Sequence, residues 1–305
     1  MSDVAYVTVD VFTSQPFAGN PLAVIPDARG IDGEAMQRIA AEFNYSETAF
    51  VLPPEDPANT ARVRIFTPTN EIPFAGHPNV GTAFVLGRRG DVFGRPVEAL
   101  CRFEEGAGLV EVWPLRRDGE VVGARIRAPR PLRVGGSVDS DVVARCASLT
   151  LADLVQSVHP PVLVSVGLPF ALAQVTDLDA LARAQPNTAA FADADRRHPQ
   201  EEDRFALFLY ATRPGTAGRL RARMFAPLSN ILEDPATGSA SAALGAYLAS
   251  LAPEPDLDTA ITIEQGVEMG RPSRIEVAIR KAGGVVGEIT VAGECVSVMR
   301  GTIAV

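Results

Sequence analysis

The feature that most constrains the fold of this chain is an internal repeat. An Arg-x-Phe-x-Pro run occupies residues 64–68 and recurs at residues 223–227, an offset of 223 − 64 = 159 residues. A glycine turn follows each run, at residues 74–83 and 233–242, and each turn opens an apolar stretch. The recurrence predicts one ancestral unit present twice, with a similar helix start in each half.

The two apolar stretches, residues 80–86 and 240–251, have almost no polar face. A helix of that kind is buried, and its first turn carries unpaired N–H groups and the positive end of the helix dipole. Pro78 suits the first helical position, with His77 as the cap before it, and Ser239 is a strong N-cap type. We expect the two helix starts to face a shared cleft and bind a carboxylate there.

Composition excludes several classes of partner. The chain has 305 residues, 47% of them hydrophobic, and a net charge of −9. This acidity argues against binding to nucleic acid or to an anionic membrane, and no apolar run reaches the length of a spanning helix, so we expect a cytoplasmic protein. The cysteines Cys101, Cys146 and Cys295 are too far apart for a metal knuckle, and we expect no metal. The glycine turns match no nucleotide-binding spacing, so we also expect no cofactor.

The predicted elements favour an α+β fold in two domains. Strand-like runs surround one apolar helix in each half, a pattern that differs from the strict alternation of a doubly wound parallel sheet. Residues 151–158 read as a short helix. Near the end of the chain, residues 285–291 and 296–299 read as two separate strands.

Glu47 is the leading candidate for a catalytic acid/base. It lies between a predicted helix over residues 32–43 and an apolar strand over 48–52, where burial would raise its pKa. The alternative is that Glu47 caps a turn or is exposed. The 159-residue offset maps Glu47 onto Ala206, so one half carries a carboxylate and the other does not. A single carboxylate suits a 1,3 proton shift on one face of a substrate, whereas a two-base racemase needs an acceptor on each face.

His77 and Asp234 occupy comparable places beside the two glycine turns. His77 could donate to a substrate oxygen or amine or relay a proton, or else serve as a cap or a core histidine. Asp234 could accept a hydrogen bond from a substrate amine, or else act only as a turn residue before Pro235.

The remaining candidates are backbone amides and small polar side chains. The amides near Gly76 and Gly238, together with Ser239, would hold a carboxylate, although Ser239 could equally be a plain N-cap. Asn20, between Gly19 and Pro21, could reach the ligand or simply form a turn, and its neighbours favour the turn.

These motifs together resemble the PhzF-like isomerase family of phenazine biosynthesis. The motifs that carry the resemblance run nearly end to end and are residues 9–12, 19–24, 46–52, 64–68, 71–78, 233–240, 265–273 and 300–303. No single motif is decisive, but their combination in this order is specific.

The resemblance implies a diaminopimelate epimerase-like fold, in which two similar domains each wrap a sheet or barrel around a central helix. The domains would comprise residues 1–125 with 297–305, and residues 126–296. The family's acid/base matches Glu47, and its substrate-binding residues match His77, Asp234 and Ser239 with the turn at Gly76. The resemblance also implies the properties of the phenazine enzyme, which looks like a homodimer that needs no cofactor. That enzyme isomerises trans-2,3-dihydro-3-hydroxyanthranilate to a reactive ketone.

Two departures affect the expected chemistry. The related epimerases use one cysteine per domain, and neither residues 46–47 nor residues 233–236 contain one, which argues against a two-thiol mechanism. Pro235 replaces the first alanine of an Asp-Ala-Ala motif, which bears on the substrate. The alternatives are therefore an amino-acid-type epimerase or racemase, and a non-catalytic carboxylate-binding protein that retains the fold.

Overall fold

The computed structural model describes residues 3–200, 204–213, 215–216 and 218–305. The chain divides into two compact units, of which unit 1 comprises Met1–Arg127 with Ala292–Val305 and unit 2 comprises Ala128–Val291. The domain boundaries expected from the sequence differ by a few residues from this division and stay a prediction. In the described part of the chain, no helix is long and apolar enough to cross a membrane.

Unit 1 contains two main helices and a ring of strands. The helices are α1 (Gly33–Phe43) and α2 (Gly76–Arg89). The strands are β1 (Asp3–Val11), β2 (Asn20–Ile25), β3 (Glu47–Leu52), β4 (Ala61–Phe66), β5 (Glu71–Ile72), β6 (Asp91–Val92), β7 (Arg95–Pro96), β8 (Cys101–Glu105), β9 (Gly108–Arg117), β10 (Glu120–Arg127) and the end of β20 (Val285–Ala304). Pairing runs β1–β2–β3–β4–β8–β9–β10–β20 and returns to β1, which closes a barrel.

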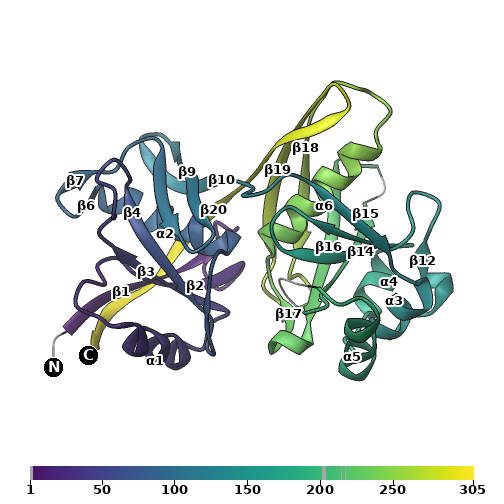
Figure 1. The fold of residues 1–305 in the computed structure, drawn as a ribbon, viewed down its shortest axis with the longest axis horizontal. Coiled ribbons are helices and arrows are strands. Elements are labelled where there is room, and N and C mark those ends of the chain that lie inside the picture. Colours follow the sequence, from purple (N-terminus) through teal and green to yellow (C-terminus); the bar gives the residue numbers. More distant parts are fainter. Residues whose placement is uncertain (1–2, 201–203, 214, 217) are drawn as a thin grey trace. The chain divides into compact units, whose positions relative to one another are not determined.

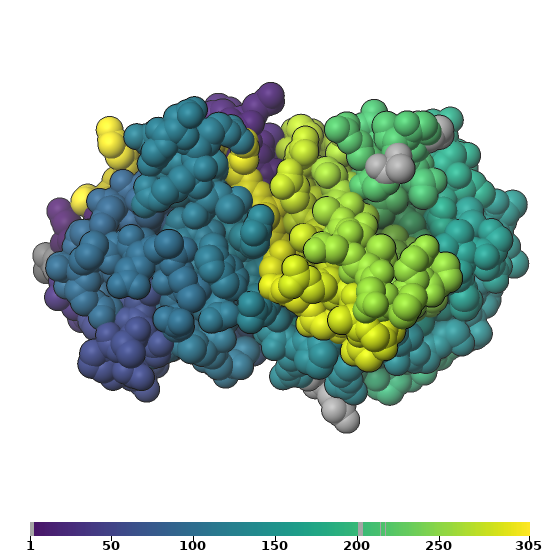
Figure 2. Space-filling view, turned by 90° about the horizontal axis from the view of Figure 1, so that it is seen from above, coloured from purple at the N-terminus to yellow at the C-terminus, as the bar shows by residue number. Residues whose placement is uncertain are grey.

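Unit 2 repeats much of this plan. Its helices are α3 (Ser140–Cys146), α4 (Leu178–Arg183), α5 (Thr188–Arg197) and α6 (Gly238–Leu251), with short 3-10 turns η1 (Leu151–Asp153) and η2 (Pro227–Ser229). Its strands are β11 (Arg133–Ser137), β12 (Leu154–Val155), β13 (Val162–Ser165), β14 (Pro169–Val175), β15 (Leu207–Thr212), β16 (Arg219–Ala226), β17 (Ile231–Asp234), β18 (Leu257–Gln265), β19 (Ser273–Ala282) and the start of β20. Figure 2 shows the surfaces of β18, β19 and the start of β20 side by side on one face of this unit, in yellow-green and yellow.

Strand register confirms the internal repeat. In unit 1, β3 and β4 are antiparallel and Thr48 pairs with Phe66. In unit 2, β15 and β16 are antiparallel and Leu207 pairs with Phe225, each 159 residues further on. The preceding pairs, β2–β3 and β14–β15, are both parallel, as are β4–β8 and β16–β18. The two halves therefore share topology as well as sequence motifs.

Helix α2 lies at the centre of unit 1 because it presents no exposed polar face before its last turn. Every residue from Gly76 to Gly87 is buried, and the helix packs against β1, β2, β3, β9 and β10 (Figure 1). A Cβ on Gly81 would lie 2.5 Å from Leu22 Cδ2, so glycine permits this close approach of helix and strand. Gly90, in the left-handed conformation, ends the helix.

Helix α6 is the counterpart of α2 in unit 2 and has the same length of 14 residues. It is rich in alanine and packs against β13, β14, β18 and β19 (Figure 1). Its small side chains let the sheet approach closely, since a Cβ on Gly245 would already lie 3.0 Å from Val277 Cγ1. The predicted α+β class, with sheets wrapped around one apolar helix per half, is confirmed.

The predicted start of each helix was wrong by two residues. Helix α2 begins at Gly76 after the N-cap Ala75, so His77 is not the cap and Pro78 is the third helical residue. Proline is tolerated there because N–H groups of the first turn have no partner within the helix. Helix α6 begins at Gly238 after the N-cap Thr237, so Ser239 is the second helical residue and not the cap.

Two other element predictions were also wrong. Residues 151–158 form one 3-10 turn followed by β12, because β12 pairs with β14, a partner that lies far along the chain. Residues 285–299 belong to one long strand, β20, which starts in unit 2 and ends in unit 1. The strand stays continuous because β20 pairs with β19 and β10 as well as with β1, whose partners are Cys295–Ala304.

The close approach of β10 and β20 predicts a strong effect of Gly123→Ala. An added methyl group at Gly123 would overlap Gly293 O and lie 2.8 Å from Glu294 Cα, both of them backbone atoms that cannot move aside. We expect a loss of about 3 kcal/mol in unfolding free energy, measured by urea denaturation. The control is Gly287→Ala on β20, where a Cβ meets nothing within 4 Å, so its unfolding free energy should stay within about 0.5 kcal/mol of the parent. An equal effect in both variants would contradict the packing argument.

Candidate active site

Glu47 is the first residue of β3 and is largely buried, with a side chain 13% exposed. Its Oε2 atom is inaccessible to solvent and accepts no hydrogen bond from any described residue. Removal from water disfavours the charged form and raises the pKa of Glu47 to about 7, an effect that the Ser46 hydroxyl partly opposes. The carboxyl group is therefore poised to take up and release a proton near neutral pH.

His77 faces this carboxyl group from the first turn of α2. Its side chain is only 6% exposed, and its Nε2 atom lies 3.5 Å from Glu47 Oε2. The barrel brings the two together because β3 is one of the strands that surround α2. An imidazole at this distance can share a proton with the carboxyl group or polarise an atom held between them.

Asn20 belongs to the same cluster, from the first residue of β2. It is fully buried, and its Oδ1 atom accepts a hydrogen bond of 3.2 Å from the Ser46 hydroxyl. The parallel pairing of β2 with β3 places Leu22 opposite Glu47, which explains why Asn20 and Ser46 meet. Asn20 thus starts a strand beside the candidate acid.

The start of α2 completes the cluster in unit 1. Its N-cap residue Ala75 has no side chain that could accept from the first N–H groups, and Gly76 follows it directly. Asn79 holds the turn from inside the helix, because its Nδ2 atom donates to Ala75 O at 2.9 Å. The first turn therefore combines backbone donors without a side-chain cap and a fixed geometry, which are the properties of an anion-binding helix start.

In unit 2, Asp234 ends β17 and is buried. Its Oδ2 atom accepts a 2.6 Å hydrogen bond from the Thr237 hydroxyl. Gln265, the last residue of β18, donates to both Asp234 O and Thr237 Oγ1 and accepts from Thr237 N. Gly238 is buried and Ser239 half-buried at the start of α6, where Thr237 makes no side-chain cap.

An arginine braces the strand before each glycine turn. Arg64 makes a two-point ion pair with Glu71 at 2.8 and 2.6 Å, and Arg223 makes one with Glu233 at 2.8 Å for both contacts. Each guanidinium also lies over the ring of the phenylalanine two residues later. These arginines are 159 residues apart, so the repeat extends to the brace that positions each turn.

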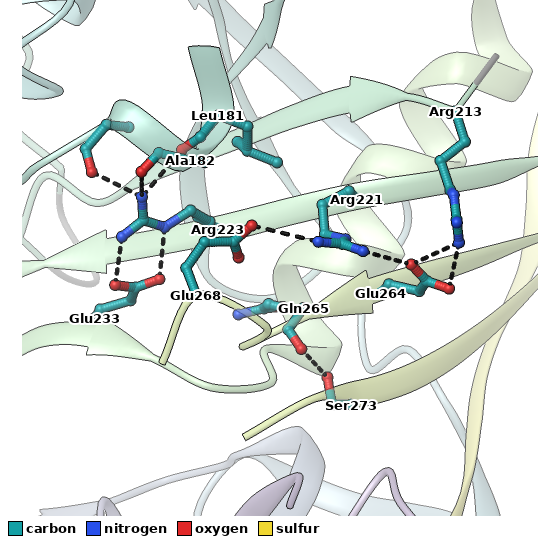
Figure 3. A network of polar contacts seen from close by, with 11 residues as sticks. Leu181, Ala182, Arg213, Arg221, Arg223, Glu233, Glu264, Gln265, Glu268 and Ser273 are labelled. Carbon is teal, nitrogen blue, oxygen red and sulfur yellow. Dashed lines mark hydrogen bonds and ion pairs between the residues drawn. The ribbon is translucent and has the colours of Figure 1, made fainter. Parts of the chain in front are cut away.

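The brace in unit 2 is the more deeply buried of the two. Arg223 also donates to carbonyl oxygens at the end of α4, to Leu181 O at 3.0 Å (Figure 3) and to Ala184 O at 2.7 Å. Arg221, two residues earlier on β16, pairs with Glu264 and Glu268, and Arg213 also pairs with Glu264 (Figure 3). These contacts join β16, β17 and β18 around the Asp234 turn.

A second buried acid, Glu105, ends β8 and was not among the predicted site residues. Both of its carboxyl oxygens are inaccessible to solvent and accept no hydrogen bond from the described residues. Burial raises the pKa of Glu105 well above its usual range, and only the neighbouring Asn79 side chain opposes this rise. Burial therefore favours the neutral form of Glu105 in the folded protein.

The predicted site residues thus form two groups. Asn20, Glu47, Gly76 and His77 come together in unit 1, and the second group in unit 2 consists of Asp234, Gly238 and Ser239. The sequence did not single out Thr237 or Gln265 as site residues. A signal for Gln265 exists in hindsight, since Gln265 continues the alternation of Ile261 and Ile263 and so places a polar side chain on the same face of β18.

The described residues contain no group of three or more histidine, cysteine or acidic side chains that could hold a metal ion. Cys101, Cys146 and Cys295 are all buried and free, and burial raises the pKa of each thiol, to about 11 for Cys101 and about 12 for Cys146. None of them is poised as a thiolate nucleophile.

The repeated α+β unit and the buried Glu47–His77 pair define a class of enzyme, the isomerases built from two related halves. Residues 9–301 match the family of phenazine biosynthesis-like proteins (PhzC-PhzF), and the chain belongs to that family. It is 36% identical to an uncharacterised isomerase of Mesorhizobium japonicum over 98% of both chains. It is also 36% identical to the trans-2,3-dihydro-3-hydroxyanthranilate isomerase of Pseudomonas aeruginosa, with 94% of this chain and 95% of that protein covered.

Among solved structures, a phenazine biosynthesis protein of the PhzF family from Bacillus anthracis has a similar fold. The TM-score is 0.88 at 27% identity, and the similarity covers 100% of both chains. The resemblance noted in the sequence is confirmed, and the protein is an isomerase of this family.

The raised pKa of Glu47 predicts that Glu47→Gln stabilises the protein at neutral pH. In the unfolded chain the carboxyl ionises near pH 4.5, whereas in the folded protein it ionises near pH 7. The stability that the raised pKa contributes is therefore present below pH 4.5 and lost as pH rises to about 7. A neutral glutamine avoids that loss.

We expect parent and Glu47→Gln to differ little at pH 4 and the variant to be more stable by about 3 kcal/mol at pH 8. Urea denaturation at both pH values measures the difference. A difference that does not change with pH would show that Glu47 ionises normally in the folded protein.

Proposed function

We propose that the protein catalyses a cofactor-independent 1,3 proton shift on a small carboxylate-bearing substrate of the trans-2,3-dihydro-3-hydroxyanthranilate type. The observation that carries the proposal is the asymmetry of the repeat. The buried Glu47 has Ala206 at the equivalent place, as the register of β3–β4 and β15–β16 requires. A single acid/base suits a reaction in which one group takes a proton and returns it on the same face.

In this mechanism the ionised Glu47 takes a proton from one carbon of the substrate. The electron pair of the broken C–H bond forms a new double bond to the middle atom. The π electrons of the old double bond then form the bond to the incoming proton at the third atom. Glu47, now neutral, returns the proton to that atom, so no proton is gained or lost overall. A carboxyl pKa of about 7 suits both steps, because each protonation state is accessible near neutral pH.

The other candidates would hold the substrate during this transfer. The N–H groups near Gly76 and Gly238, with Ser239, would bind the substrate carboxylate, since neither helix start has a side-chain cap. Asp234 would accept from the substrate amine. His77, 3.5 Å from Glu47, would stabilise negative charge that develops as the proton leaves. Asn20 would keep Ser46 oriented beside the acid or contact the substrate directly.

Two rival functions make different predictions. An amino-acid-type epimerase would incorporate solvent deuterium at a stereocentre with inversion and without movement of a double bond. A non-catalytic carboxylate-binding protein would be stabilised by such ligands and exchange no proton with solvent. The desolvated Glu47 favours an enzyme over the binding protein, and the alanine at position 206 favours one acid/base over two.

We further propose that the protein acts in the cytoplasm as a homodimer. The family resemblance supports the dimer, and the three free, buried cysteines are compatible with a reducing compartment. Light scattering of the purified protein would give a mass near twice 32.3 kDa if the dimer forms.

The proposal predicts that Glu47→Gln abolishes turnover. Loss of a general acid/base typically costs 10²–10⁴-fold in rate, so we expect kcat with trans-2,3-dihydro-3-hydroxyanthranilate to fall by about 10³-fold or more. The matched control is Glu105→Gln, which also replaces a buried carboxyl of unit 1 by an amide and should retain the parental rate. Retained turnover in Glu47→Gln would exclude Glu47 as the proton carrier.

The pKa of Glu47 also predicts the pH profile of the free enzyme. A base must be ionised to accept a proton, so kcat/KM should rise with pH and level off above about pH 7. Initial rates between pH 5 and 9 measure this profile. A rise of kcat/KM centred near pH 4.5 instead would mean that the carboxyl group responsible is exposed to solvent.

A further inference from the structure

A buried hydrogen-bond chain in unit 2 connects Gln265 to Asp234 through Thr237. Gln265 Nε2 donates to Thr237 Oγ1 at 2.9 Å, and Thr237 Oγ1 donates to Asp234 Oδ2 at 2.6 Å. All three residues are buried. Because a hydroxyl has one proton, its donation to the carboxylate fixes its acceptor side toward Gln265.

The orientation of the Gln265 amide is fixed by the backbone of the same turn. Its Oε1 atom accepts from Thr237 N at 3.0 Å, and its Nε2 atom donates to Asp234 O at 2.8 Å. Reversing the amide would place two acceptors together and two donors together. The direction of the whole chain, from amide to hydroxyl to carboxylate, therefore follows from the positions of backbone groups.

The end of β18 also contacts the Asp234 turn through main-chain atoms. Ser273 Oγ lies 3.1 Å from Gln265 O (Figure 3) and 3.2 Å from Pro235 O, so its one proton is shared between two main-chain carbonyls. A Cβ on Gly266 would lie 2.5 Å from Pro235 O and Arg271 O, so only glycine allows this approach. This close approach at Gly266 holds the end of β18, and with it Gln265, against the turn.

Thr237 occupies the N-cap position of α6 but does not cap it. An N-cap threonine ordinarily accepts a hydrogen bond from the second or third N–H of its helix. Here its hydroxyl group serves Gln265 and Asp234, and α6 has no side-chain cap. The Thr237 side chain therefore has two effects. It orients the Asp234 carboxylate, and it leaves the N–H groups of Ser239 and Ala240, which an N-cap hydroxyl would engage, without that acceptor.

We propose that Thr237 and Gln265 are positioning residues of the isomerase, which orient Asp234 toward a substrate amine and keep the start of α6 available for a substrate carboxylate. The inference rests on the proposed function and extends it to two residues that act through Asp234 and the helix backbone. It requires a substrate that carries an amine or similar donor next to a carboxylate.

The central test compares Thr237→Val with Thr237→Ser. Valine keeps the branched shape and removes the hydroxyl group, whereas serine keeps the hydroxyl group. We expect Thr237→Val to raise KM for trans-2,3-dihydro-3-hydroxyanthranilate about tenfold or more and to change kcat less than about twofold. The reason is that the variant loses the hydrogen bond to the Asp234 carboxylate, a group that binds the substrate but does not transfer the proton. Thr237→Ser should restore KM to within about twofold of the parent.

Gln265→Glu provides a second route to the same result. It keeps the size of the side chain and replaces the Nε2 donor by an oxygen, which cannot donate to Asp234 O or to Thr237 Oγ1. The matched control is Ser273→Ala, which removes a buried hydrogen bond from the same turn without touching the Asp234 carboxylate. We expect Gln265→Glu to raise KM as Thr237→Val does and Ser273→Ala to leave KM unchanged.

A double-mutant cycle separates positioning from general loosening of the turn. If Thr237 acts through Asp234 in orienting the amine, Thr237→Val should raise KM much less in an Asp234→Ala background than in the parent. Equal effects in both backgrounds, or an equal rise of KM in Ser273→Ala, would overturn the proposal.

Crystal structures of Thr237→Val and Thr237→Ser give a readout that needs no turnover. We expect the Asp234 carboxylate to rotate in the valine variant and to keep its place in the serine variant. An unmoved carboxylate in Thr237→Val would overturn the inference. If the parent protein fails to isomerise the substrate, the proposed function fails, while a rotated carboxylate would still uphold the positioning role.

Discussion

The removal of one carboxyl group from water is the interaction on which the rest of this structure depends. Glu47 lies at the start of a strand in a closed barrel, where burial raises its pKa to about 7. Such a group destabilises the folded state, so the surrounding structure must offset the cost. The barrel does so by enclosing α2, whose first twelve residues are all buried.

The repeat explains how the chain positions polar groups inside an apolar core. In each half an arginine pairs with a glutamate on the short strand before the helix, and its guanidinium covers a phenylalanine ring. A two-point ion pair holds backbone direction better than a single contact does. The halves then diverge at the site itself, since unit 1 has Glu47 and His77 while unit 2 has Asp234 with its Thr237–Gln265 support.

Much of the fold could be predicted because its signals are local. The apolar helices around Gly81 and Gly245, the strands beside Arg64 and Arg223 and the offset between the halves are all confirmed. The helix starts were wrong because their backbone conformation depends on the preceding strand and not on the capping preference of one residue. The predicted helix over residues 151–158 was wrong because the pairing of β12 with β14 overrides a weak helical pattern.

The sequence by itself determined that the chain is a duplicated α+β fold with two apolar helices and one unmatched glutamate, because these are properties of periodicity and residue type. Only the tertiary structure decided that Glu47 is desolvated beside His77, that Glu105 is buried, and that the Thr237 hydroxyl serves Asp234. Burial and hydrogen-bond direction depend on strands that are distant in sequence. Gln265 meets Thr237 across 28 positions, and no local pattern specifies that contact.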